Sequence, residues 1–571
     1  MFTDLPRDDA FLQWTWPDIA QYYQELDALA LDADALEAFL RQWAGLSDCL
    51  TELQVRLHIA TTIDTADAEA KERFERFLAE IFPPSAQAEQ RLRQKLLASG
   101  LEPAGLQIAV RDMRTDVALF REANLPLFVR EQALENRYYA VTGAQTVRWE
   151  GEERTLDQLH PIYLDRDRTR REQAWRLERA RQLEDRGAIA DLWREFLGVR
   201  LQQAANAGFA DYRSFRWQQL KRFDYTPADS LRFQQAIEEV VVPAASRLYE
   251  QRRQRLGVET LRPWDLAVDP LGLPRLRPFE TVEALATTAA RIFGRVDPAF
   301  GRYFATMQRE HLLDLDARKN KAPGGYCETL PYAQRPFIFM RAVGVHDNVQ
   351  TLLHEGGHAV HAFEMNALPY GTLHGFPGSE FAEVASMGME LLASPYLAAA
   401  EGGFYSDADA KRARIEHLES VITFWPYMAV VDAFQHWVYE HPADAVNPDE
   451  CDARWAQLWG RFMPGVDWSG LEREQRNGWQ LKLHIHVAPF YYVEYGLAQL
   501  GAVQVWANAR RDQAGAVAAY RAALALGNTV ALPELFAAAG ARFAFDAATL
   551  RAAVGVAEDT IGELSEIRDD L

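Results

Sequence analysis

Residues 347–361 read Asp-Asn-Val-Gln-Thr-Leu-Leu-His-Glu-Gly-Gly-His-Ala-Val-His, and this stretch decides the class of fold. Its apolar residues recur at three- and four-residue spacing after Asp347, a good N-cap, which predicts an amphipathic helix. His354 and His358 lie one turn apart on that helix, so both imidazoles can reach one Zn²⁺ ion. Glu355 lies beside them and can take a proton from a water molecule. The stretch therefore contains a His-Glu-x-x-His motif, which is typical of zinc-dependent hydrolysis.

Two glycines, Gly356 and Gly357, follow Glu355 inside the predicted helix. Each costs about 1 kcal/mol of helix stability relative to alanine. Two such residues at one place suggest a function, here the close approach of another chain segment or of a substrate. The alternative interpretation is an ordinary pair of helix histidines held by hydrogen bonds, with Glu355 in solvent.

A catalytic zinc ion needs a third protein ligand and an open position. A three-histidine arrangement would need glycine at position 361 and histidine at position 364, but the chain has His361 and Glu364 there. The other option is a carboxylate from the following predicted helix, where Glu380 and Glu383 are both candidates. Glu390 lies two turns after Glu383 and could hold a ligand histidine through its other N–H, or be an ordinary exposed carboxylate.

A second unusual segment, residues 484–495, reads His-Ile-His-Val-Ala-Pro-Phe-Tyr-Tyr-Val-Glu-Tyr. Pro489 suits the first turn of a helix, on which Tyr492 and Tyr495 would share one face. A buried aromatic stripe with two incidental histidines is the alternative interpretation, because aromatic side chains usually pack.

Most of the remaining sequence predicts helices. Apolar residues repeat at helical spacing from Asp18 to Leu97, and residues 166–186 alternate arginine with acidic residues, as on a solvated helix face. The clearest strand runs from Arg335 to Met340, where Pro336 favours an edge position. Such an edge can bind an extended peptide as an added strand, or merely finish a small sheet.

Composition excludes several classes of protein. The 571 residues carry a formal net charge of −21, which argues against nucleic-acid or anionic-membrane partners. The length predicts more than one structural lobe. Three cysteines are too few for a disulfide framework, the N-terminus has no signal pattern, and the most apolar stretch, residues 421–431, is too short to span a bilayer. We therefore expect a soluble cytoplasmic protein.

The segment around Glu383 resembles the third-ligand segment of the M3 metallopeptidases, the thimet oligopeptidase and oligoendopeptidase F group. The oligoendopeptidase F branch is the most similar. The resemblance covers residues 314–327, the Pro336 strand, residues 381–386 and residues 484–495, and more weakly residues 520–546.

This resemblance implies a mainly α, two-lobed zincin with a small β-sheet beside the zinc site and a deep central channel. It implies a mainly helical N-terminal lobe over residues 1–313 and a zinc peptidase catalytic region over residues 314–571. A narrow channel would admit short unstructured peptides and exclude folded proteins.

The resemblance also implies the site. One Zn²⁺ ion per chain would be held by His354, His358 and Glu383, with Glu355 as general base and later proton donor. The expected activity is endopeptidase cleavage of short unstructured oligopeptides through a metal-activated water. The alternatives are a helical metallocarboxypeptidase, which needs a cationic pocket for a free C-terminus, and a non-catalytic zinc-containing peptide-binding protein.

Members of this family place a histidine and tyrosines opposite the zinc ion, as donors to the oxyanion of the tetrahedral intermediate. On one alignment His484, Tyr492 and Tyr495 take these roles. A shift of one or two residues brings in His486 and Tyr491 instead.

Overall fold

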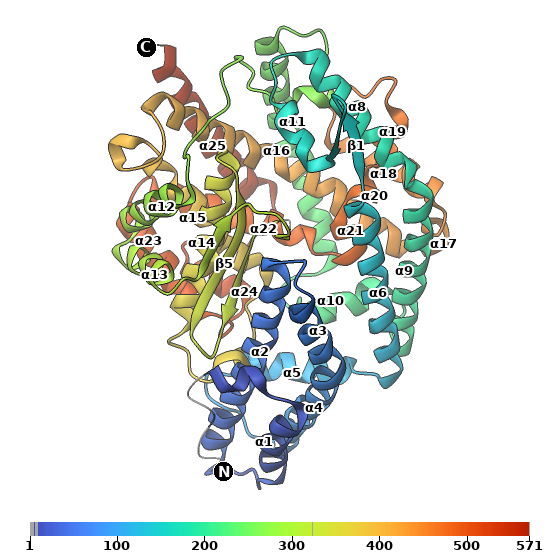
Figure 1. Cartoon of the computed structure of the whole chain (residues 1–571), viewed down its shortest axis with the longest axis vertical. Helices are drawn as coiled ribbons and strands as arrows, with labels where there is room; N and C mark the ends of the chain where they lie inside the picture. The colour runs from blue at the N-terminus through green and yellow to red at the C-terminus, as the bar shows by residue number, and fades with distance from the viewer. Residues whose placement is uncertain (1–4, 6–8, 323, 570–571) are drawn as a thin grey trace. The chain divides into compact units, whose positions relative to one another are not determined.

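The computed structural model of the chain describes residue 5, residues 9–322 and residues 324–569, with only the backbone for residues 9 and 566–569. Most of the N-terminal stretch that lacks a signal pattern, and Pro323 of the 314–327 segment, lie outside the described residues. Helices make up most of the described chain and strands form only two small sheets (Figure 1). The mainly helical class is therefore confirmed.

Two compact units divide the chain. The boundary expected between residues 313 and 314 falls inside unit 1, because a long N-terminal helix packs against the sheet that follows residue 313. The assignment of residues 314–571 as the catalytic region remains a prediction. Unit 1 comprises Met1–Ala118, Leu276–Ala413 and Ala498–Phe543, and unit 2 comprises Leu119–Arg275, Arg414–Leu497 and Ala544–Leu571.

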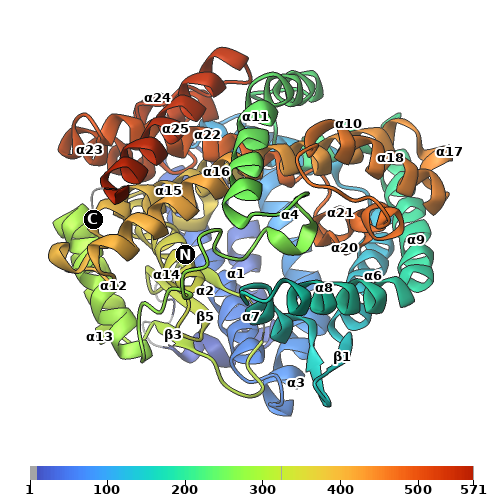
Figure 2. The same cartoon turned by 90° about the horizontal axis from the view of Figure 1, so that it is seen from above.

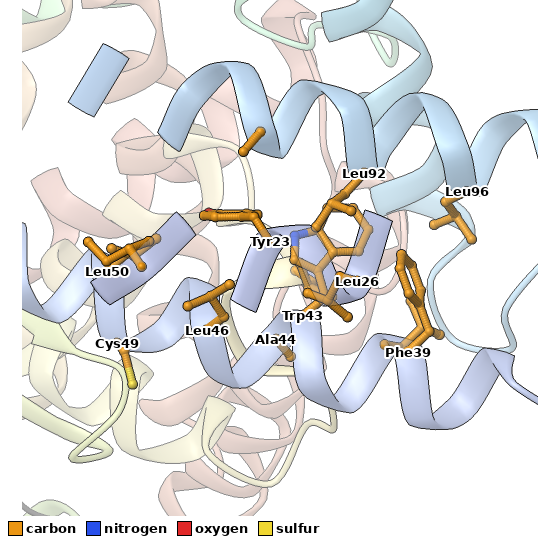
Figure 3. Close-up of a cluster of buried hydrophobic side chains, with 14 of the residues drawn as sticks. Tyr23, Leu26, Phe39, Trp43, Ala44, Leu46, Cys49, Leu50, Leu92 and Leu96 are labelled. Atoms are coloured by element: carbon orange, nitrogen blue, oxygen red, sulfur yellow. The ribbon is translucent and has the colours of Figure 1, made fainter. Parts of the chain in front are cut away.

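The helical region expected from Asp18 to Leu97 forms a bundle in unit 1. Trp43 lies in its core with Tyr23 and Leu92, which come from two other helices (Figure 3). Glu89 accepts hydrogen bonds from the Tyr23 hydroxyl at 2.6 Å and the Trp43 indole N–H at 2.8 Å, so these polar groups are satisfied. The helices of this region are α1 (Trp16–Ala28), α2 (Leu36–Ile63), α3 (Ala68–Arg76) and α4 (Phe82–Ser99), and α5 (Gln107–Leu119) follows them.

The three-stranded sheet of unit 1 consists of β3 (Leu313–Asp316), β4 (Tyr326–Leu330) and β5 (Arg335–Ala342), in the order β3-β5-β4. The expected strand is present, but its prediction as an edge strand was wrong because β5 is central. Pro336 is tolerated there since β3 pairs with β5 only from Ile338 onward. The outer strands of this sheet are β3 and β4.

Helices cover this sheet within unit 1. The ligand-bearing helix α14 (His346–Met365) packs against β5 and lies beside α15 (Ser379–Ala393) (Figure 1). The long N-terminal helix α2 packs against β4, where the hydroxyls of Thr62 and Tyr326 lie 2.6 Å apart. The other helices of unit 1 are α12 (Val282–Val296), α13 (Pro298–Arg309), α23 (Gln513–Leu526) and α24 (Leu532–Ala538).

The described residues of unit 2 form helices and one hairpin, which consists of β1 (Thr146–Trp149) and β2 (Glu152–Thr155). The charged stretch 166–186 forms α8 (Arg168–Glu184) as expected (Figure 2). Arg176 and Glu172 form an i,i+4 ion pair at 2.8 Å on this helix. The other helices are α6 (Leu125–Gly143), α7 (His160–Tyr163), α9 (Arg186–Asn206), α10 (Tyr212–Gln219), α11 (Pro227–Leu256), α17 (Pro442–Ala445), α18 (Pro448–Phe462), α19 (Glu472–Arg476), α20 (Gly478–Leu481), α21 (Leu483–Val487) and α25 (Ala547–Asp569).

Two long helices continue from one unit into the other. They are α16 (Asp407–Glu440) and α22 (Tyr492–Ala509). Within the described part of the chain, no helix combines the length and apolarity that crossing a bilayer requires.

Candidate functional site

Helix α14 carries the His-Glu-x-x-His motif and begins at His346, with Val345 as its N-cap. The expectation that Asp347 caps the helix was therefore wrong. Asn348 stabilises the start of the helix instead. Its side-chain oxygen accepts hydrogen bonds from the backbone N–H groups of Val343 at 2.8 Å and Val345 at 3.3 Å. Asp347 lies in the first turn, where a negative charge is favourable to the helix dipole.

Both motif glycines lie where another segment approaches α14 closely, as expected. A Cβ atom on Gly356 would lie 2.8 Å from Cε1 of Phe293. A Cβ atom on Gly357 would lie 2.6 Å from the Cα of Ser386, in α15. Gly357 therefore allows α14 to touch the backbone of α15, and Gly356 makes room for the ring of Phe293 in α12.

Three side chains of unit 1 converge on one point. The Nε2 atoms of His354 and His358 lie 3.3 Å and 3.6 Å from Oε2 of Glu383. One donor atom from each residue lies within 4.8 Å of the other two, so these residues could hold a metal ion. Among the described residues, His354, His358 and Glu383 form the group of His, Cys, Asp or Glu side chains with donor atoms this close together. Glu380 does not belong to this group.

Further groups hold these donors in place. Oε1 of Glu390 lies 2.7 Å from Nδ1 of His354, so the interaction considered for this carboxylate is present. The Ser386 hydroxyl donates to Oε2 of Glu383 at 2.8 Å. Burial opposes ionisation of Glu383, yet the hydrogen bond with His354 and the charges of both histidines lower the Glu383 pKa to about 2. Two imidazoles and an ionised carboxylate, with His354 oriented by Glu390 and Glu383 by Ser386, form a donor set that fits zinc.

Glu355 lies next to these ligand candidates without being one of the three. Its side chain is buried, with 8% of the residue exposed. Burial and the charges of Glu383 and Glu390 raise the Glu355 pKa to about 7, against the opposing effect of His354. A carboxylate with a pKa near neutrality suits a general base.

Glu364 and His361, the positions that a three-histidine arrangement would use, do not belong to the metal-binding group. Glu364 accepts a hydrogen bond from Nε of Arg521 at 2.8 Å and another from the Tyr303 hydroxyl at 3.2 Å. His361 is 1% exposed, and burial lowers its pKa to about 3. Both side chains therefore contribute to packing around α14.

The aromatic segment of unit 2 brings its predicted residues together. The His484 ring lies 5.0 Å from the Tyr492 ring and 5.9 Å from the Tyr495 ring, measured between centroids. Tyr491 lies 6.0 Å from His484, so it belongs to the same cluster. The expected helix is present but starts at Tyr492, which places Pro489 before it.

His486 is separated from this cluster. It is fully buried, stacked on Tyr138 at 4.5 Å and on Trp479 at 5.8 Å. Burial lowers its pKa to about 3, and its backbone carbonyl accepts a hydrogen bond from Arg200. A side chain in this position is a core residue, so His484 is the better candidate for contact with a substrate.

Sequence reasoning missed two features of this segment. Phe490 adopts a positive φ of 66°, a strained conformation for a bulky residue. Its N–H donates to Oε1 of Gln435 at 2.7 Å, and its carbonyl accepts from Arg222, which pairs with Glu494. Lys482 was also missed, although a lysine two residues before His484 in an apolar segment was a signal that could have found it.

A metal-binding helix pair with the His-Glu-x-x-His motif and a distant glutamate, on a mainly helical fold, defines a helical metallopeptidase. The model of peptidase family M3 matches residues 163–554, and the chain belongs to that family.

Solved structures with similar folds extend over the whole chain. A structure of PZ peptidase A with an inhibitor has 26% sequence identity and a TM-score of 0.86, over 99% of this chain and 98% of that one. A protein assigned as an oligoendopeptidase F has 27% identity and a TM-score of 0.86, over 98% of both chains. Another, from Bacillus anthracis str. Ames, has 24% identity and a TM-score of 0.82, over 98% and 97%. Among curated proteins, no sequence matches at a significant level.

Proposed function

We propose that the protein is a zinc-dependent endopeptidase that cleaves short, unstructured oligopeptides. The observation that carries this proposal is the convergence of His354, His358 and Glu383, with Glu355 beside them but outside the group. A site that merely stores metal does not need the additional buried carboxylate. Membership of family M3 supports the same activity.

In the proposed mechanism, His354, His358 and Glu383 would hold one zinc ion. Zinc would supply Lewis-acid polarisation of the scissile carbonyl and of the attacking water. Glu355 accepts the proton of that water and later delivers it to the leaving amine. Glu390 holds the imidazole of His354 by its Nδ1 atom, so that Nε2 faces Glu383 and would be available to bind the metal.

We also propose that His484, Tyr492 and Tyr495 donate hydrogen bonds to the developing oxyanion. The resemblance to the M3 metallopeptidases motivates these roles, and the contacts among the three rings support them. Donors arranged before the reaction stabilise negative charge without reorganisation during it.

For substrate recognition, the outer strand β4 is the proposed partner of the peptide backbone. Its pairing with β5 occupies one side, and no described strand pairs with the other. Main-chain hydrogen bonds to such an edge suit extended peptides of varied sequence. This proposal replaces the edge role expected for β5.

The test is hydrolysis of an internally quenched peptide of about ten residues, blocked at both ends, with and without a chelator. We expect cleavage inside the peptide, loss of activity with chelator and recovery on addition of zinc. Cleavage only of peptides with a free C-terminus would favour the metallocarboxypeptidase alternative. Zinc binding without any hydrolysis would favour the non-catalytic peptide-binding protein.

A further inference from the structure

Lys482 lies between the short helices α20 and α21 of unit 2, beside the aromatic cluster. Its ammonium nitrogen is 2.9 Å from the Tyr492 hydroxyl oxygen. It also lies 4.2 Å from the Tyr492 ring centroid and 5.3 Å from the Tyr427 centroid, so aromatic faces surround it. The residue is half-buried. Burial of a lysine ammonium among aromatic rings is unfavourable, which suggests that this residue has a function.

The direction of the hydrogen bond between Lys482 and Tyr492 follows from the chemistry of the two groups. A lysine ammonium has three donors and no acceptor, so the Tyr492 oxygen must accept. The phenol has a single proton, which must then point away from Lys482. Within the described residues, no acceptor lies within hydrogen-bonding distance of that proton. The Tyr492 hydroxyl is therefore a buried donor whose partner must come from outside the chain.

The charge of Lys482 is also uncompensated. Within the part of the chain that the structure describes, Lys482 forms no ion pair with a carboxylate. Burial lowers its pKa to about 8, and burial raises the pKa of Tyr492, which stays protonated. The titratable and charged groups around this pair are Tyr427 of α16, Tyr138 of α6, Arg179 of α8, His484 and His486 of α21 and Tyr495 of α22.

We propose that Lys482 is a positioning residue that holds the Tyr492 hydroxyl with its proton directed at the substrate. This inference rests on the proposed function, in which Tyr492 donates to the developing oxyanion. A donor that is already oriented pays no cost of reorientation in the transition state. Lys482 supplies this orientation because it can only donate.

The same arrangement makes activity dependent on the protonation of Lys482. A neutral amine has a lone pair, which can accept the Tyr492 proton. The Tyr492 hydroxyl would then donate its proton to the Lys482 amine and could no longer donate it to the substrate. Because the Lys482 pKa is about 8, kcat should be about tenfold lower at pH 9 than at pH 7.

The experiment compares Lys482→Arg and Lys482→Met with the parent, using the zinc-loaded enzyme and an end-blocked peptide. Arginine stays protonated and cannot accept, so we expect Lys482→Arg to keep kcat at pH 7 and to keep it at pH 9. Methionine removes the donor, so kcat should fall about tenfold at pH 7 with little change in KM, and the decline from pH 7 to pH 9 should disappear. An alkaline decline that persists unchanged in both variants overturns the proposal.

Three further measurements isolate this effect. Lys71→Met removes a positive charge from an exposed position of α3 and should leave kcat and its pH profile at parent values. Melting temperatures show whether each variant is folded. An increase in KM confined to peptides with a free C-terminus, with kcat unchanged, would identify Lys482 as a site for a substrate carboxylate and overturn the positioning role.

Failure of this inference and failure of the proposed function give different results. If Tyr492→Phe loses kcat but Lys482→Met does not, Tyr492 is a catalytic donor and the positioning role is wrong. If Tyr492→Phe keeps the parent kcat, the role of Tyr492 in the proposed function is wrong and this inference falls with it. If both matter, Lys482→Met should have no further effect on kcat in the Tyr492→Phe background.

Discussion

A Cβ atom placed on Gly357 would lie 2.6 Å from the Cα of Ser386, so α14 and α15 are in backbone contact next to the candidate metal centre. Ser386 lies one turn after Glu383 and donates to its carboxylate. The close contact at Gly357, where no side chain fits, therefore sets the distance between the two histidines of α14 and Glu383 of α15. This explains why the motif tolerates glycine inside a helix.

Gly357→Ala should lower zinc affinity by at least about tenfold, because the added methyl group pushes Glu383 away from the histidines. Zinc affinity is measured by competition with a chelator. Gly198→Ala, in α9, is the matched control, since a Cβ there meets no atom within 4 Å. The control should gain up to about 1 kcal/mol of stability and keep its zinc. Equal zinc affinity in both variants would show that the helix contact does not set the ligand geometry.

Glu355→Gln should keep its zinc and lose nearly all hydrolysis, with kcat lower by about 10² to 10⁴. Glutamine has nearly the same shape but cannot accept the proton of water. Elemental analysis of metal content, together with turnover of a quenched peptide, tests this expectation. Substantial turnover in a zinc-loaded variant would rule out Glu355 as the general base.

Glu383→Ala should lower zinc affinity by more than about 100-fold, while Glu380→Ala and Glu364→Ala should change it much less. Glu383 is the carboxylate within 3.6 Å of both histidines, whereas Glu364 pairs with Arg521. Glu364→Ala should therefore lower the melting temperature and leave metal content unchanged. Parent-like zinc affinity in Glu383→Ala would make Glu380 the next candidate.

Glu390→Gln should weaken zinc affinity by about 10- to 100-fold, without removing a ligand. The carboxylate lies 2.7 Å from Nδ1 of His354, and its charge increases the basicity of that imidazole. The glutamine amide would retain a weaker hydrogen bond, so the defect should be smaller than that of Glu383→Ala. A defect as large as that of Glu383→Ala would instead indicate direct ligation.

The local sequence was sufficient to predict how the residues of the metal-binding motif are arranged on helix α14. His354 and His358 share a face of α14 because helical periodicity places them one turn apart, and the two glycines correctly indicated a close approach. Helix starts were less predictable. Val345 precedes α14, although its side chain cannot cap, because Asn348 satisfies the backbone from inside the helix.

Features that depend on distant segments could not be predicted from local sequence. The central position of β5 depends on pairing with β3, which precedes it by some twenty residues, and Pro336 alone favoured an edge. Unit 1 gathers three separate segments, an arrangement that depends on contacts between distant parts of the chain. The contact between Lys482 and Tyr492 joins residues ten positions apart across the turn at Phe490, whose positive φ no residue preference indicates.

The last prediction concerns the tyrosines around His484. If Tyr492 and Tyr495 donate to the developing oxyanion, removing one hydroxyl should affect the transition state more than substrate binding. Loss of one such donor typically lowers kcat by about 10²- to 10³-fold. Phenylalanine keeps the ring and its contacts, so stability and zinc content should hardly change.

The comparison therefore uses Phe substitutions at Tyr491, Tyr492 and Tyr495, with kcat and KM measured separately. We expect a large kcat defect at Tyr492 or Tyr495 and a defect of less than about tenfold at Tyr491. A large defect at Tyr491 alone would shift the alignment by one residue. It would leave His484 as the histidine of the site, because His486 is stacked between Tyr138 and Trp479 in the core. Parent-like kcat in all three variants would mean that the rings only pack, and that the oxyanion donors lie elsewhere.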